Sequence, residues 1–179
     1  MKKPLVVYHD ACTDGFGAAF AALLKLGEEA QYLPVSYGND CYIEMLGYAE
    51  NGIIGREVYV LDFSFPKEDM KHLFANANRV VWLDHHVSSR EIAVVLCEYD
   101  SLEMKDYARL EHEELNWRIV HDNNKSGALL AWEFFHPGTE VPMLIQHIDD
   151  RVAKAFGGGG HKNAAGFQTD VQTLMGWLK

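Results

Sequence analysis

Aspartates and histidines follow the apolar runs in the first half of the chain. They are His9, Asp10, Asp14, Asp62, Asp84, His85 and His86. If these side chains converge, they repel or desolvate one another unless a cation lies among them. Mixed oxygen and nitrogen ligands suit manganese, zinc or iron, and carboxylate-rich sets favour manganese or magnesium. Each aspartate alone could instead cap the helix that follows it, but the whole set favours a metal site.

The elements that would position these residues are short apolar strands alternating with helices. We expect strands at Pro4–Tyr8, Ala30–Val35, Glu57–Asp62, Arg79–Asp84 and Val94–Tyr99. Helical patterns cover Gly15–Leu26 and Tyr42–Glu50, and Ser64, Pro66 and Glu68 resemble the cap and first turn of another helix. This order predicts an α/β fold with a mainly parallel sheet and helices on both faces. The carboxyl ends of parallel strands open on one edge, where ligands bind in such folds.

The second half has weaker patterns. We expect a solvated helix over Asp100–Asn116, a strand at Trp117–Val120, and helices at Ser126–Phe135 and Val141–Asp150. Ser126 is interpreted as a helix N-cap. The tryptophans lie in apolar patterns, so we assign them to the core rather than to base stacking; they are Trp82, Trp117, Trp132 and Trp177.

The composition limits the class of protein. The 179 residues are 48% hydrophobic, which predicts a packed core. The net charge of −10 disfavours binding to long duplex nucleic acid, which needs lysine and arginine. The three cysteines are widely spaced, which argues against a disulfide framework. No apolar run approaches the roughly 20 residues that cross a bilayer, and the N-terminus lacks the features of a secretory signal. We expect a cytoplasmic protein.

Five segments together resemble the DHH phosphoesterase superfamily. Asp84-His85-His86 is similar to the triplet that names the family. The other four segments are Tyr8–Ala22, Val58–Pro66, Leu144–Arg151 and the glycine-rich Gly157–Phe167. They occur in the family order and extend over nearly the whole chain. A triplet alone would be weak evidence, because short motifs recur by chance.

The resemblance implies two divalent ions, with Mn²⁺ preferred and Mg²⁺ or Co²⁺ possible. Asp62 would bridge the ions, and Asp14, His85 and Asp150 would bind one of them. His9 would complete the other site. Together the ions would activate a water molecule and stabilise charge on phosphorus. His86 would contact phosphate or protonate the leaving oxygen, and Asp84 would orient an imidazole.

One position departs from the pattern. Many family members carry an aspartate where this chain has Cys12. We interpret Cys12 as a partly buried structural thiol, and ligation of a soft metal is the alternative.

The expected domains are a metal-binding α/β domain at 1–150 and, at 151–179, a remnant of the family's substrate-binding domain. The remnant would bind substrate phosphate through Gly158, Gly159, Gly160, His161 and Asn163, although a flexible turn is the alternative for this segment. Its 29 residues cannot bury a core of their own, so they would pack on the first domain or on a second subunit of a homodimer.

The resemblance favours hydrolysis of small nucleotides or short single-stranded oligonucleotides. The alternatives are hydrolysis of pyrophosphate or short polyphosphate, and a nucleotide-binding scaffold without turnover.

Overall fold

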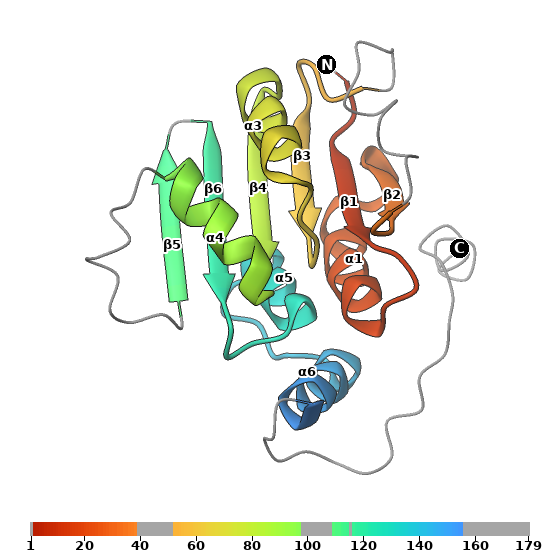
Figure 1. The fold of residues 1–179 in the computed structure, drawn as a ribbon. Coiled ribbons are helices and arrows are strands. Elements are labelled where there is room, and N and C mark those ends of the chain that lie inside the picture. The colour runs from red at the N-terminus through yellow and green to blue at the C-terminus, as the bar shows by residue number, and fades with distance from the viewer. Residues whose placement is uncertain (1, 39–51, 98–108, 115, 156–179) are drawn as a thin grey trace.

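The computed structural model describes residues 2–38, 52–97, 109–114 and 116–155. Its strands are β1 (Leu5–His9), β2 (Gln31–Val35), β3 (Glu57–Leu61), β4 (Arg79–Asp84), β5 (Arg109–Glu114) and β6 (Trp117–Asp122). Its helices are α1 (Thr13–Leu26), α3 (Lys67–Asn76), α4 (Val87–Leu96), α5 (Gly127–Phe135) and α6 (Met143–Ala155), with a short 3-10 helix η1 (Gly27–Glu29). Figure 1 shows their arrangement.

The strands form one sheet in the order β2-β1-β3-β4-β6-β5. The first five strands in that order are parallel, and β5 runs antiparallel to β6 at the edge. This confirms the predicted α/β fold with a mainly parallel sheet. The chain places β2 on one side of β1 and the later strands on the other, so the strand order reverses between β1 and β3. Ligands bind at such a reversal in open α/β sheets, outside the carboxyl ends of the strands.

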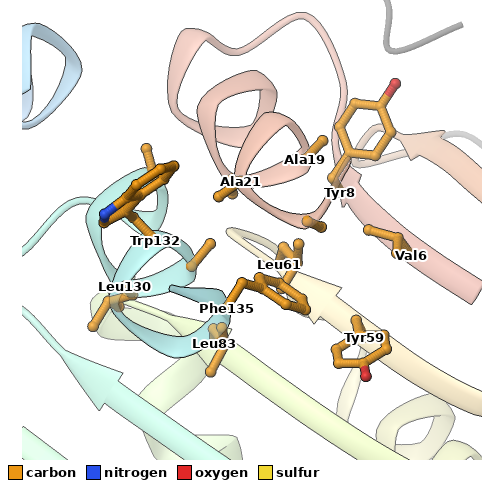
Figure 2. Packing of buried hydrophobic residues seen from close by; sticks show 14 of the residues in the cluster. Val6, Tyr8, Ala19, Ala21, Tyr59, Leu61, Leu83, Leu130, Trp132 and Phe135 are labelled. Atoms are coloured by element: carbon orange, nitrogen blue, oxygen red, sulfur yellow. The ribbon is translucent and has the colours of Figure 1, made fainter. Parts of the chain in front are cut away.

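Helices cover both faces of the sheet. Alternate residues of a strand point to opposite faces, so each central strand contributes side chains to two cores. On β4, Val81 and Leu83 belong to the core under α1, α5 and α6, whereas Val80 and Trp82 belong to the core under α3 and α4. Figure 2 shows the first core, where side chains of α5 meet those of α1 and the sheet. Each core is a continuous apolar layer, and together the two layers hold the sheet, with the strand ends that bear the site, between the helices.

Close packing of three helices depends on a glycine in α1. A Cβ atom at Gly17 would lie 2.7 Å from the Cβ of Ala128 in α5 and 2.7 Å from Cδ1 of Ile148 in α6. Backbones can approach this closely only where a side chain is absent. The Gly17 contact therefore holds α5 and α6 against α1 on the side of the molecule that carries the strand ends of β1 and β3.

The strand predicted at Val94–Tyr99 is wrong, because α4 continues to Leu96. The β-branched run favoured a strand, but Ile92, Ala93 and Leu96 recur at helical spacing and pack on the second core. Residues 98 and 99 lie outside the described part of the chain.

The solvated helix predicted for Asp100–Asn116 is also wrong where the structure describes it. Residues 109–114 form β5, an edge strand whose Glu111 and Glu113 side chains are exposed. Arg118 of β6 pairs with Glu111 at 2.6 Å, so contacts to the neighbouring strand override the local charge pattern. The opposite edge strand, β2, contains Pro34.

Several remaining expectations concern helix ends. Ser126 caps α5 as predicted, since its hydroxyl accepts a hydrogen bond from the Leu129 N–H. Ser64 does not cap α3: Pro66 takes that position, and Ser64 is buried. The predicted helix near Tyr42–Glu50 lies outside the described residues. The last helix runs to Ala155, past the predicted domain boundary at 150.

Within the described residues, no helix has the length and apolar character needed to cross a membrane.

Candidate metal centre

Asp62 lies at the end of β3, where the strand order reverses. Its side chain is completely buried, and neither carboxylate oxygen has a hydrogen-bond partner. A buried carboxylate that accepts no hydrogen bond costs several kcal/mol unless a positive charge compensates it. The position therefore calls for a positive charge close to both oxygens.

Three imidazoles surround this carboxylate. His85 Nε2 lies 3.1 Å from Oδ1, His9 Nδ1 lies 3.6 Å from Oδ2, and His86 Nδ1 lies 3.9 Å from Oδ1. Ligand atoms at right angles around an ion at about 2.1 Å stand about 3 Å apart. The separations around Asp62 therefore suit donors that share a cation.

Asp14 joins the group from the first turn of α1. One of its oxygens lies 3.2 Å from His85 Nε2. Its two oxygens also accept hydrogen bonds from the backbone N–H groups of Gly127 and Ala128, at 3.0 and 2.6 Å. The amino end of α5 thus holds Asp14 in place and favours its negative charge. Burial and the nearby Asp62 charge act the other way and raise the pKa of Asp14.

Asp84 organises the turn after β4. Its Oδ1 accepts hydrogen bonds from the backbone N–H groups of His85 and His86, at 2.7 and 3.2 Å, and lies 2.7 Å from His86 Nδ1. This contact fixes the His86 ring, whose side chain is 34% exposed and is the most accessible imidazole of the group. His86 is therefore both oriented by the protein and open to solvent.

Three histidines of the site carry raised pKa values, and for His86 the main cause is the hydrogen bond to the Asp84 carboxylate. Burial lowers the pKa of His85, but the carboxylates of Asp14 and Asp62 outweigh it and raise the pKa to about 10. The Asp62 carboxylate, with a smaller contribution from Cys12, raises the pKa of His9 to about 10. Protons therefore occupy the donor atoms that a metal ion would need.

The backbone is strained at two points of the site. Among the described residues other than glycine, positive φ angles occur at Ala11 (52°) and Asp62 (54°). A left-handed conformation costs about 1–2 kcal/mol in such residues. Ala11 forms the turn that brings Cys12 and Asp14 back over the end of β1, and Asp62 itself bears the buried carboxylate at the centre of the group. Strain of this kind concentrates at functional sites.

The structure brings together six of the residues singled out in the sequence: His9, Asp14, Asp62, Asp84, His85 and His86. Asp10 is exposed, and its carboxylate accepts a hydrogen bond from Ala11. Asp150 lies in α6, but its side chain is outside the described part. Its neighbour Asp149 accepts a hydrogen bond from the Ser126 N–H at 2.8 Å. The predicted phosphate loop at Gly158–Gly160, His161 and Asn163 also lies outside the described residues.

Sequence reasoning missed two residues of the site. A Cβ atom at Gly127 would lie 2.6 Å from both Cβ and Oδ1 of Asp62, so the first residue of α5 must be glycine. The available signal was a glycine where a helix former is expected. His121, to which we assigned no role in the site, is buried, and its Nε2 contacts the His86 carbonyl at 2.7 Å. Only the pairing of β4 with β6 reveals that contact.

Comparisons with known proteins place the fold but give no activity. No protein-family model matches the chain. An uncharacterized protein of Acanthamoeba polyphaga mimivirus is 26% identical over 156 residues, which cover 82% of this chain and 32% of that protein. The chain thus spans about a third of that relative's length.

A crystal structure of an uncharacterized protein from Helicobacter pylori G27 is similar with a TM-score of 0.58 and 14% identity. The match covers 87% of this chain and 44% of that one. At this identity the similarity shows the fold alone, so the function is argued from the site.

Proposed function

We propose that the protein is a metal-dependent phosphoesterase that hydrolyses phosphodiester or phosphomonoester bonds of small nucleotides or very short oligonucleotides. One observation carries the proposal: Asp62 is fully buried, its two oxygens accept no hydrogen bond, and it lies among imidazoles where the strand order reverses. A carboxylate with such surroundings fits a bridging metal ligand. The five segments that resemble the DHH superfamily contain these same residues.

The donor set fits two divalent ions that share Asp62. His85 and His86 stand next to Oδ1, Asp14 stands next to His85, and His9 stands next to Oδ2. Asp150 would add a carboxylate to the Asp14 side. Oxygen and imidazole donors suit Mn²⁺, with Mg²⁺ or Co²⁺ as substitutes. When bound, the ions supply an activated water and stabilise negative charge on the phosphoryl oxygens.

His86 and Asp84 then serve the substrate. Because Asp84 holds Nδ1 of His86, the opposite ring nitrogen is free to contact a phosphate oxygen or to protonate the leaving oxygen. Asp84 positions the ring and does not touch substrate. Its second oxygen has no hydrogen-bond partner and is buried, which strengthens its electrostatic hold on the imidazole.

An exposed aromatic ring beside the cluster supports a nucleotide substrate. Tyr37 is 54% exposed, stacks on Phe63 at 4.5 Å between ring centroids, and lies 5.4 Å from the His9 ring. Aromatic rings in this setting bind bases by stacking, worth about 1–3 kcal/mol per base. The acidic net charge disfavours long polyanions. We further propose a cytoplasmic location and assembly into a homodimer.

A substrate panel tests the proposal. The panel contains a dinucleotide, a five-nucleotide RNA, cyclic dinucleotides, 3′,5′-bisphosphoadenosine and pyrophosphate, each with Mn²⁺ and with a chelator. We expect Mn²⁺-dependent release of phosphate or nucleotide from one or more of the nucleotides, and its loss in His85→Ala. Turnover of pyrophosphate alone would replace the nucleotide assignment by the pyrophosphatase alternative. Tight nucleotide binding without turnover would favour the scaffold.

A further inference from the structure

Cys12 lies beside the metal centre without serving the helix that it precedes. It is the N-cap residue of α1, with extended backbone angles, but its side chain makes no capping hydrogen bond. N-cap positions favour serine, threonine, asparagine or aspartate because those side chains accept such a bond. The thiol is partly exposed and is not in a disulfide. Its position therefore needs another explanation.

The thiol faces the same point as a carboxylate and an imidazole. One donor atom each of His9, Cys12 and Asp62 lies within 4.8 Å of the other two. Asp62 Oδ2 and His9 Nδ1 lie 3.6 Å apart, and both are buried atoms that make no hydrogen bond. The three donors come from the end of β1, the start of α1 and the end of β3. Unsatisfied atoms from separate segments that meet beside a thiol indicate a ligand between them.

We propose that Cys12 is a metal ligand together with His9 and Asp62, and that this half of the centre selects a soft divalent ion, Zn²⁺ or Co²⁺, over Mn²⁺ and Mg²⁺. Thiolates bind soft ions, whereas carboxylate and imidazole donors accept harder ones. The other half, formed by Asp14, Asp62 and His85, has no sulfur donor among the described residues. The two halves therefore share Asp62 but differ in the ions that they bind. This inference rests on the metal centre of the proposed function and replaces the interpretation of Cys12 as a structural thiol.

Cobalt absorption tests the thiolate ligand directly. The full chain, stripped of metal, is titrated with Co²⁺ under anaerobic conditions, and the near-ultraviolet charge-transfer band of a cobalt–thiolate bond is recorded. We expect the band in the wild type and in the matched control Cys97→Ser, and its loss in Cys12→Ser and Cys12→Asp. A wild type that binds Co²⁺ without the band, or a band that persists in Cys12→Ser, would overturn the inference.

The affinities for Zn²⁺ and Mn²⁺ test whether Cys12 makes the site prefer the softer ion. Competition with a chromophoric chelator measures Zn²⁺ and Mn²⁺ binding to the wild type and to Cys12→Asp, which retains a negatively charged donor. We expect Zn²⁺ affinity at one site to fall by about 10-fold or more in Cys12→Asp, with Mn²⁺ affinity retained or increased. Equal Zn²⁺ affinity in both proteins would contradict the selectivity.

A measurement on the wild type does not depend on whether the Cys12 variants fold. The rate at which iodoacetamide alkylates Cys12 is followed by mass spectrometry. We expect Zn²⁺ to protect Cys12 from alkylation and to leave the alkylation rate of Cys97 unchanged. Alkylation of Cys12 at the same rate with saturating Zn²⁺ would refute ligation.

The cobalt band without any hydrolysis would remove only the proposed function. Mn²⁺-dependent hydrolysis without the band would remove only the Cys12 ligand.

Discussion

Asp62 combines complete burial with two oxygens that accept no hydrogen bond. In the metal-free chain, the positive charge that it needs comes from protonated His9 and His85, whose pKa values are both raised. A bound cation would supply the same compensation more strongly and displace those protons. The negative charge of Asp62 is therefore compensated either by protonated histidines or by a bound cation, and the two states can be measured separately.

Replacing Asp62 by asparagine should separate metal binding from folding. Because the asparagine side chain is neutral, the metal-free variant should unfold at the same temperature as the wild type or higher. The increase in Tm caused by Mn²⁺ should disappear, and hydrolysis should fall by at least about 100-fold. Thermal unfolding with and without Mn²⁺, alongside the substrate assay, measures both. Glu68→Gln, at an exposed position of α3, is the control. An unchanged Mn²⁺ shift in Asp62→Asn would exclude Asp62 as a ligand.

At the residue scale, side-chain type and position after a strand were enough to select most of the cluster. His9, Asp62 and His85 each follow an apolar run, so their convergence could be predicted once parallel strands were expected. The unpartnered oxygens of Asp62 could not be predicted, because hydrogen-bond satisfaction depends on every neighbour. For Cys12 the sequence left a structural thiol and a soft-metal ligand as alternatives, because the turn at Ala11, with its positive φ angle, is visible only in the structure.

At the scale of elements, the amino end of α5 supports the site from the side. Its first two N–H groups bind Asp14, and the missing side chain of Gly127 leaves room for Asp62. The hydroxyl of its cap, Ser126, accepts a hydrogen bond from the Leu129 N–H of the same helix. Gly127 thus affects the position of Asp62 and Ser126 affects the stability of α5, and the two residues can be changed one at a time.

Gly127→Ala and Ser126→Ala should therefore have different effects. The new methyl group of Gly127→Ala would collide with Asp62, which should cost about 1–3 kcal/mol of stability and abolish Mn²⁺ binding. Ser126→Ala removes the cap and should cost about 1 kcal/mol while Mn²⁺ binding remains. Urea unfolding and calorimetric titration with Mn²⁺ distinguish the two variants. Retained binding in Gly127→Ala would show that the Asp62 position tolerates displacement.

Elements were predictable where burial is repeated along the chain. The strands β1, β3 and β4 are apolar on both sides because helices cover both faces, so each appears in the sequence as a continuous run. The strand β5 has no such signal: it is an edge strand with exposed glutamates and depends on pairing with β6. The helix α4 was missed because β-branched residues near its end resemble a strand locally.

At the scale of the whole molecule, the strand order decides where the site lies. The reversal between β1 and β3 opens the sheet edge where His9 and Asp62 meet. The sequence predicted parallel strands but not their order, because order depends on contacts between distant segments. The location of the site at the reversal is therefore a result of the structure.

Metal binding should depend on pH through the whole cluster. His9 and His85 have raised pKa values in the metal-free fold, so their stabilising contribution is complete below the ordinary value of 6.5 and is lost as the pH rises towards about 10. Binding of Mn²⁺ must release these protons, so the Mn²⁺-induced increase in Tm should be larger at about pH 8.5 than at about pH 6. Calorimetry in buffers of different ionisation enthalpy measures the protons released. A Tm increase independent of pH, with no proton release, would contradict this account.

The two edges of the described sheet bear on how copies of the chain meet. The unpaired N–H and C=O groups of an edge strand can hydrogen-bond to a strand of another chain. Charged side chains or proline on the edge make this pairing unfavourable. Glu111 and Glu113 are exposed on β5, and β2 contains Pro34, which has no N–H to donate. The sheets of two copies should therefore not pair edge to edge, even at high concentration, so the growth of fibres from the native state is disfavoured. A dimer would have to be joined through helices or connecting segments.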